Sequence, residues 1–278
     1  MRRITKKCID EYILRVEKGE KSKATAIKYR RAISSLYKFA YGENAGRETV
    51  LNWKEHISSK YSPGTVNAFI SAANGFLEFC GYQDCKMKPL KTQRNIFRDE
   101  KRELSKGEYL RLVETAKRTG NERLKLIMET LGSTGIRISE LRFITLEAVI
   151  NGKAIVNCKG KQRPVLIPKA LRKMLKKYAN KKGISTGSLF ITSKGNPVDR
   201  SNIWKEMKRL CEKAGVLAGK VFPHNFRHLF AVIYYKTYKD IAKLADLLGH
   251  SSINTTRIYL MESGQTHEKQ IESLGLIL

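Results

Sequence analysis

Apolar residues recur at helical spacing through the first ninety residues. Between residues 25 and 40 they fall every three or four positions, as on one face of an amphipathic helix. A second stripe follows Ser62-Pro63, where serine can cap the first turn and proline suits its first position. Shorter helical patterns cover about residues 5–18 and 47–59. We therefore expect an N-terminal domain of four helices over residues 1–90.

A basic stretch with little periodicity follows this domain. Lysines and arginines surround Pro89 between residues 86 and 102 and show no regular apolar spacing. We expect a linker at residues 91–102. It either runs along a phosphate backbone or is an ordinary solvated linker, and its composition does not decide between the two.

The hydrophobic pattern changes twice in residues 103–278. Ser105 and Glu108 form a capping-box pattern ahead of one helix, and a second helix is expected at about residues 121–132. Residues 147–167 show strand signals, with a turn at 159–162, and residues 189–191 suggest another short strand. Helical patterns return at about 169–182, at 200–214 and from Pro223 onward. We expect a mainly α (α+β) protein, whose larger domain is mostly helical with a small antiparallel β-sheet.

Composition agrees with two domains and adds a strong charge. The chain has 278 residues, and 54 Lys and Arg against 26 Asp and Glu give a net charge of +28. No apolar run is long enough for a membrane span, and no apolar stretch of signal-peptide type follows the basic start. The five cysteines are widely spaced, so free thiols are expected rather than disulfides or a zinc site. We expect a cytoplasmic protein without membrane contact.

The basic residues are not evenly spread. Residues 151–200 hold 13 basic residues and a single acidic one. A solvated lysine-rich face normally has acidic residues interspersed, and here they are nearly absent. This pattern favours a surface that faces the phosphates of a nucleic acid.

Several common catalytic patterns are missing. There is no P-loop motif, and the paired histidines of His-Asn-Phe-Arg-His lack the glutamate of the zinc-protease motif. Asp is scarce, which argues against acidic two-metal nuclease sites. What remains is a set of cationic, imidazole and phenol groups, namely Arg137, Lys159, His224, Arg227, His250 and Tyr259.

The order and spacing of these groups resemble the tyrosine recombinase or integrase family, which includes phage integrases and Xer-type recombinases. The matching segments read TGIRISEL, CKGKQR, PHNFRH and LLGHSSINTTRIY, and they lie within residues 103–260. The N-terminal domain is similar to the core-binding domain of that family. Small departures occur at Cys158, at Phe226 and after Tyr259, and none of them removes a chemical group.

The resemblance implies cleavage and rejoining of DNA through a 3′-phosphotyrosyl intermediate, with Tyr259 as nucleophile. Two arginine forks, Arg137 and Arg227, can each bridge phosphate oxygens and stabilise a phosphorane-like transition state. This set of groups needs no metal ion or other cofactor. Rejoining needs no ATP, because the phosphotyrosyl bond conserves the energy of the backbone bond.

The remaining groups receive roles in proton transfer and support. His224 is the candidate base or proton shuttle and His250 the donor to phosphate, although these two roles could be exchanged. Lys159 would protonate the leaving 5′-oxygen. Glu140 either braces the basic groups of the site or forms a simple ion pair on a helix surface.

The expected partners are double-stranded DNA and further copies of the chain. The two domains would clamp a duplex, with Lys153, Lys161 and Arg163 near the hairpin and Arg30, Arg31 and Lys60 in the N-terminal domain contacting phosphates. The apolar tail at residues 264–278 either packs on its own domain or docks into a neighbouring protomer. We expect a monomer in free solution, a homotetramer on two duplexes, and association with the nucleoid.

The biological role implied is site-specific recombination or integration, as in a mobile genetic element. Two alternatives remain at this point. One is a nicking-closing enzyme of type IB topoisomerase character that uses the same residues on one duplex. The other is a non-catalytic DNA-binding regulator with a recombinase fold.

Overall fold

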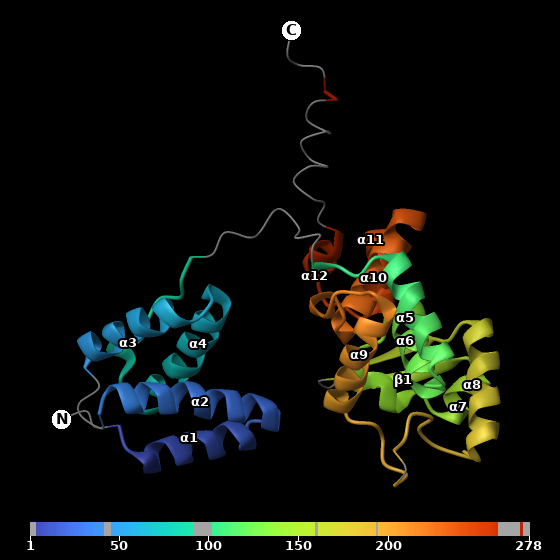
Figure 1. The fold of residues 1–278 in the computed structure, drawn as a ribbon. Coiled ribbons are helices and arrows are strands. Elements are labelled where there is room, and N and C mark those ends of the chain that lie inside the picture. Colours follow the sequence, from blue (N-terminus) through green and yellow to red (C-terminus); the bar gives the residue numbers. More distant parts are fainter. Residues whose placement is uncertain are drawn as a thin grey trace. The chain divides into compact units, whose positions relative to one another are not determined.

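The computed structural model describes residues 4–41, 46–91, 102–158, 161–192, 194–260 and 273–274. The chain forms two compact units, Met1–Arg94 and Asn95–Leu278. Each unit has its own hydrophobic core and is described by itself (Figure 1).

In the N-terminal unit, the described residues form four α-helices and a 3₁₀ turn. The helices are α1 (Lys6–Lys18), α2 (Lys23–Phe39), α3 (Arg47–Lys60) and α4 (Pro63–Phe79), followed by η1 (Gln83–Cys85). Their apolar stripes meet around the fully buried Trp53, Phe76 and Leu36. Side-chain caps begin the first two helices, because Thr5 and Ser22 accept hydrogen bonds from backbone N–H groups of the first turn.

The larger unit is mostly helical around a large core, with a smaller hydrophobic cluster beside it. Its helices are α5 (Lys106–Arg118), α6 (Glu122–Thr134), α7 (Leu146–Asn151), α8 (Lys169–Lys182), α9 (Arg200–Ala214), α10 (Pro223–Tyr238), α11 (Ile241–Leu248) and α12 (Ile253–Arg257), with 3₁₀ turns η3 (Ile138–Phe143), η4 (Ala218–Lys220) and η5 (Ile258–Leu260). Strands β1 (Lys153–Cys158) and β2 (Lys161–Leu166) form a two-stranded antiparallel sheet. The expectation of a mainly α fold with a small antiparallel sheet is confirmed.

The structure corrects the detail of the region expected to contain strands. Residues 146–151 form helix α7, because the Thr145 hydroxyl caps its first turn and buried Val149 ties it to the core. Lys161 pairs with Cys158, so β2 begins inside the segment expected to be a turn. Residues 189–191 form no regular strand, and Ile191 makes only an isolated bridge to Pro197.

Two segments expected to have particular roles lie largely outside the described residues. Of the linker at 91–102, only Lys91 and Arg102 are described. Of the tail at 264–278, only Ser273 and Leu274 are described. Within the described helices, none is both long and apolar enough to cross a membrane.

Candidate functional site

Near the beginning of η3, the buried carboxylate of Glu140 binds two arginines, Arg137 and Arg163. Glu140 is 1% exposed, and its Oε1 accepts a hydrogen bond from Arg137 Nη1 at 3.0 Å. Its Oε2 accepts from the Arg137 backbone N–H at 2.9 Å and from Arg163 Nη2 at 2.8 Å. A buried carboxylate is costly unless it is paired, and here two guanidinium groups and a backbone N–H satisfy it. Glu140 therefore braces the basic groups rather than forming a surface ion pair.

A third arginine, Arg227, lies inside the unit on helix α10 and is 1% exposed. Its Nη1 donates to the Gly135 carbonyl at 2.6 Å and its Nη2 donates to the Leu248 carbonyl at 2.6 Å. Both carbonyls lie at helix C-termini, those of α6 and α11, where backbone acceptors lack partners within the helix. The ends of two helices thus fix the position of the guanidinium.

Arg227 retains capacity to bind an anion. No carboxylate pairs with it in the part of the chain that the structure describes, and its buried Nε has no hydrogen-bond partner there. Burial, together with the charge of Arg137, lowers the pKa of Arg227 to about 10. The guanidinium remains charged at neutral pH but lacks a counterion, so a phosphate oxygen would supply the missing acceptor and charge.

Tyr259 lies among three imidazole rings. Its hydroxyl is 3.4 Å from Nε2 of His224, and the rings of His224, His228 and His250 lie 5.4–5.6 Å from its own ring, centroid to centroid. The His250 ring stacks on it with an interplanar angle of 12°. The Tyr259 ring is buried in a small cluster with Ala231 and two leucines of α11, which fixes the direction of its hydroxyl.

Both histidines proposed for chemistry are held in the neutral form. His224 is exposed at the surface of the unit, but partial desolvation and the charges of Arg227 and Arg137 lower its pKa. Burial and the same arginines lower the pKa of His250 to about 4. A neutral imidazole at His224 can accept a proton from the Tyr259 hydroxyl at neutral pH.

The partners of His250 define its tautomer. Arginine has no acceptor, so Arg227 Nη2 donates to His250 Nε2 at 2.9 Å. The proton of the neutral ring therefore lies on Nδ1, which donates to the Thr256 hydroxyl at 2.8 Å. In this arrangement His250 orients Arg227, and its role as a donor to phosphate stays a prediction.

Two glycines allow the close packing of the site. Gly135 ends α6 in the left-handed region with φ +62°, and a Cβ there would collide with Phe230 and Leu248. Gly249 ends α11 with φ +65°, and a Cβ there would overlap the Arg163 side chain. These contacts explain a glycine two residues before Arg137 and another directly before His250.

The structure places the other predicted residues as follows. Lys159 and the side chain of Lys161 lie outside the described residues. Lys153 is exposed at the beginning of β1, whereas the Arg163 guanidinium points inward to Glu140 and to the Leu247 carbonyl at 3.0 Å. In the N-terminal unit, Arg30 pairs with Asp10, Lys60 contacts His56, and Arg31 is exposed.

Sequence reasoning missed three residues around the site. His228 lies one turn after His224 and contacts the Tyr259 ring, and that spacing on one helix face was the available signal. Thr256 is fully buried against His250, which only the fold reveals. Asn225 donates to the carbonyls of Arg102 and Lys220, at 2.7 Å each, and ties the beginning of the unit to α10.

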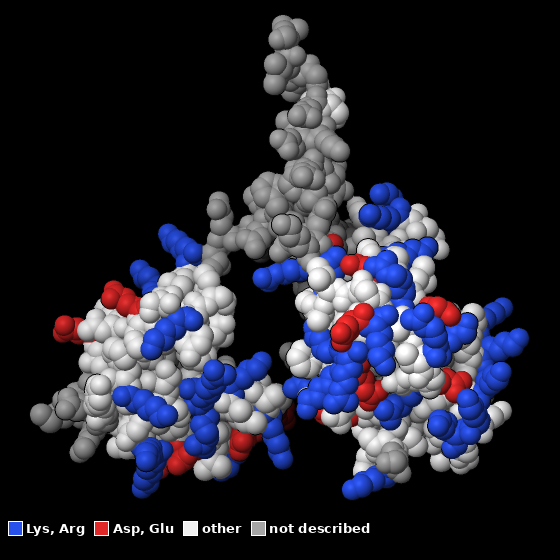
Figure 2. Space-filling model, viewed as in Figure 1, with Lys and Arg blue, Asp and Glu red and all other residues white. Residues whose placement is uncertain are grey.

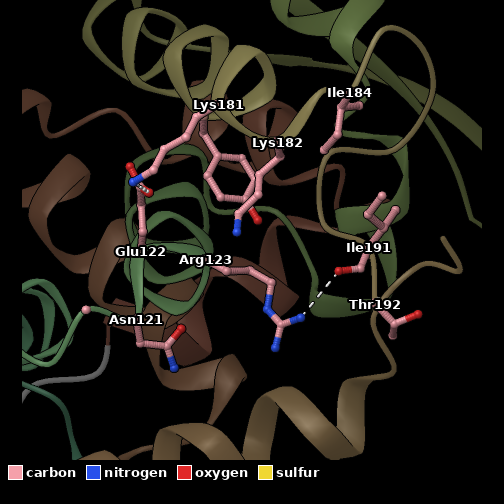
Figure 3. Close-up of a pocket in the computed structure, with 10 residues that line it drawn as sticks. Asn121, Glu122, Arg123, Lys181, Lys182, Ile184, Ile191 and Thr192 are labelled. Carbon is pink, nitrogen blue, oxygen red and sulfur yellow. Dashed lines mark hydrogen bonds and ion pairs between the residues drawn. The ribbon is translucent and has the colours of Figure 1, made fainter. Parts of the chain in front are cut away.

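A cavity of about 560 Å³ opens at the other end of α6, near its N-terminus, whereas Gly135 and Arg137 follow its C-terminus. Within it Lys181 contacts Glu122, and Arg123 donates to the Ile191 carbonyl (Figure 3). The cavity contains none of the residues around Tyr259. Among the described residues, no three His, Cys, Asp or Glu side chains are arranged to hold a metal ion.

Among the charged side chains on the visible face of each unit, basic ones are more abundant than acidic ones (Figure 2). Helix α8 alone carries seven lysines and arginines and no acidic residue. This surface agrees with the concentration of positive charge in residues 151–200.

The chain was compared with known proteins. Residues 102–265 match the model described as the phage integrase family. The chain is 26% identical over 277 residues to tyrosine recombinase XerA of Pyrococcus furiosus, covering 97% of this chain and 94% of the relative. It is 30% identical over 277 residues to tyrosine recombinase XerD of Staphylococcus haemolyticus, covering 90% and 92%.

Solved structures share the fold. A crystal structure of a lambda integrase dimer bound to a COC′ core site superposes with a TM-score of 0.73 at 18% identity, covering 92% of this chain and 94% of that one. The chain belongs to the phage integrase family and is a tyrosine recombinase, an enzyme of site-specific DNA recombination.

Proposed function

We propose that this enzyme cleaves and rejoins DNA through a covalent 3′-phosphotyrosyl bond at Tyr259, acting as a tetramer on two duplexes. The observation that carries the proposal is the position of the Tyr259 hydroxyl, 3.4 Å from the His224 Nε2. In the same cluster lies Arg227, a buried cation without a carboxylate partner among the described residues.

The reaction begins with attack of the Tyr259 oxygen on the scissile phosphorus. The hydroxyl proton passes to the neutral His224, the bond from the Tyr259 oxygen to phosphorus forms, and the bond from phosphorus to the 5′-oxygen breaks. Lys159 supplies the proton to the leaving 5′-oxygen. Rejoining reverses these steps with a 5′-hydroxyl from the same or the second duplex.

Arg137 and Arg227 stabilise the added negative charge of the transition state. Each guanidinium is fixed before substrate binds, Arg137 by Glu140 and Arg227 by two backbone carbonyls, so little reorganisation is needed. Two such cations can provide the charge stabilisation that a metal ion gives in other phosphoryl-transfer enzymes. The phosphotyrosyl bond conserves the bond energy, so the reaction needs neither metal nor ATP.

The DNA contacts and the assembly are part of the same proposal. Residues 1–90 form the core-binding domain, with Arg30, Arg31 and Lys60 near phosphates, and Lys153 and Lys161 contact the backbone beside the catalytic cluster. Related structures include XerH bound to difH and a lambda integrase tetramer bound to a Holliday junction, and these support a tetramer on DNA. DNA as substrate places the enzyme at the nucleoid.

A nicked suicide substrate tests the chemistry. Duplex DNA is selected from a randomised pool by the wild-type protein, and a nick beside the cleavage position lets the short 5′-hydroxyl product leave. Wild-type enzyme should then accumulate a covalent adduct, and Tyr259→Phe should form none while binding the same DNA. Tyr234→Phe removes a hydroxyl from the same apolar cluster and should retain the adduct.

Each outcome has a separate meaning. An adduct that persists in Tyr259→Phe would refute the assignment of the nucleophile. Wild-type protein that binds the selected DNA but forms no adduct would favour the non-catalytic regulator. Relaxation of supercoils without strand exchange between two labelled duplexes would indicate the topoisomerase type.

The assembly is tested separately. Sedimentation of the DNA complex should give a tetramer, and deletion of residues 266–278 should reduce it to smaller species if the tail docks into a neighbouring protomer. An unchanged tetramer after the deletion would contradict that role of the tail.

A further inference from the structure

Arg163 extends from β2 into the catalytic cluster, although the sequence had suggested a phosphate contact at the surface. Its side chain is only 12% exposed. Its Nη2 donates to Glu140 Oε2 at 2.8 Å and its Nη1 donates to the Leu247 carbonyl at 3.0 Å. The two acceptors lie on different elements, so a single guanidinium joins β2, η3 and the end of α11.

Arg163 limits how Glu140 can bind Arg137, because both arginines donate hydrogen bonds to this one carboxylate. One carboxylate oxygen receives Arg137 Nη1, and the other receives Arg163 Nη2 in addition to the Arg137 backbone N–H. While Arg163 occupies the second oxygen, the Arg137 guanidinium is held through one of its terminal nitrogens only. The Arg137 side chain is 36% exposed, and no other described residue occupies the rest of its guanidinium fork, which can bind another acceptor.

Removal of Arg163 would change this balance. Oε2 of Glu140 would lose its guanidinium partner. Because a buried carboxylate oxygen with an unbalanced charge is costly, it would attract the nearest cation. That cation is Arg137, which could turn to make a bidentate contact with Glu140. A guanidinium held in this way lies farther from a bound phosphate and has its charge partly neutralised.

The second contact of Arg163, with the Leu247 carbonyl, holds the C-terminal end of α11. The Leu247 and Leu248 carbonyls accept from Arg163 and Arg227 respectively, so the end of α11 is fixed by two arginines from different elements. Gly249 follows directly, and its lack of a side chain leaves space for Arg163 to pass. This arrangement sets the backbone that leads into His250.

We infer that Arg163 is a positioning residue: by sharing Glu140 with Arg137 and fixing the end of α11, it keeps Arg137 turned toward the scissile phosphate. This inference rests on the proposed function, because it assigns Arg137 to that phosphate. It also separates Arg163 from Lys153, an exposed cation on the same hairpin.

The test compares rates and binding of the full-length enzyme on the selected suicide substrate. Arg163→Ala should lower the single-turnover cleavage rate about 10–100-fold, as expected for a misplaced catalytic group, with the DNA dissociation constant changed less than about 2-fold. Lys153→Ala should show the opposite split, with weaker binding and a salt slope lower by about one. Arg163→Lys should recover little, because an ammonium cannot donate to both acceptors as the guanidinium fork does.

A substrate with a neutral methylphosphonate at the scissile position shows whether Arg163→Ala slows cleavage by misplacing Arg137 or by weakening the fold. With one phosphate charge removed, an arginine that stabilises this charge matters less, so the penalty of Arg137→Ala should shrink. The penalty of Arg163→Ala should shrink in parallel, and the double variant should lose little more than Arg137→Ala alone on the ordinary substrate. Hydrogen exchange of the α11 amides shows that each variant is folded.

The outcomes distinguish this inference from the proposed function. If Arg137→Ala cleaves the ordinary substrate at the wild-type rate, the proposed role of Arg137 is wrong and the inference about Arg163 falls with it. If Arg137→Ala behaves as expected but Arg163→Ala shows the same penalty on both substrates, or only weaker binding, the inference alone is overturned.

Discussion

Gly249→Ala adds one methyl group at the point where α11, Arg163 and His250 meet. Gly249 adopts φ +65°, where an alanine is strained, and its Cβ would overlap Cδ and Nε of Arg163. The Arg163 chain cannot simply move aside, because its guanidinium is fixed by Glu140 and the Leu247 carbonyl. We therefore expect two separate costs, one from the backbone and one from the collision.

The two costs can be estimated. The left-handed conformation costs a non-glycine residue about 1–2 kcal/mol. Forcing a methyl group into a packed site costs about 1–3 kcal/mol more. The free energy of unfolding of the larger unit should therefore fall by about 2–5 kcal/mol.

Gly215→Ala is the matched control. Gly215 ends α9 with φ +60°, and its backbone N–H bonds the carbonyls of Cys211 and Glu212, as the Gly249 N–H bonds those of Ala245 and Asp246. A Cβ at Gly215 meets no atom within 4 Å. This variant should lose only the backbone cost of about 1–2 kcal/mol.

Hydrogen exchange measured by mass spectrometry over a urea series gives a free energy for the α9 and α11 amides of the full chain. Equal losses for Gly249→Ala and Gly215→Ala would refute the collision with Arg163. The double variant Gly249→Ala/Arg163→Ala supplies a second check: without the arginine the collision is gone, so the double variant should lose less stability than the sum of the two single variants. Purely additive losses would show that the methyl group and the arginine do not meet.

Three further predictions follow from the same cluster. The lowered pKa of His224 keeps its ring neutral at pH 7, so the cleavage rate should fall only below pH 6.5, and His224→Gln should remove this dependence in single-turnover assays. His250 has a folded pKa of about 4, below its ordinary 6.5, so the unfolded chain binds the proton first on acidification. The free energy of unfolding of the larger unit should therefore fall by about 1–3 kcal/mol as the pH is lowered from 6.5 to 4. Urea titrations of His250→Gln should show a smaller fall over the same pH range. Asn225→Ala leaves the Arg102 and Lys220 carbonyls without their shared donor and should cost about 1–3 kcal/mol of stability in urea unfolding.

The helices could be predicted because their signals are local. The capping box at Ser105 and Glu108 forms as expected, and α6 occupies the stripe that the apolar spacing indicated. The sequence does not predict helix α7, because a six-residue helix has too few turns to show a helical periodicity and it precedes directly the alternating residues of β1. Its Thr145 cap and the left-handed Gly152 decide the conformation.

The predicted groups of the site were found through their spacing, whereas the contacts among them depend on the tertiary fold. His224, His250 and Tyr259 are neighbours in space, as a shared chemistry would require. The direction of Arg163 could not be predicted. Alternation along β2 places it on one face of the strand, and only the packing of η3 and α11 against that face turns it from a surface cation into a partner of Glu140.

The way in which each arginine is held determines how much charge it can offer to a phosphate. A carboxylate partner neutralises a guanidinium, whereas a backbone carbonyl orients it and leaves its full charge. Arg163 and Arg137 share the single charge of Glu140, while Arg227 is held by the Gly135 and Leu248 carbonyls. Among the described residues these three cations thus share one carboxylate, and burial together with the charges of Arg137 and Arg163 lowers the pKa of Arg227. A bound phosphate would balance this excess of positive charge, so DNA should stabilise this unit beyond what its surface lysines provide.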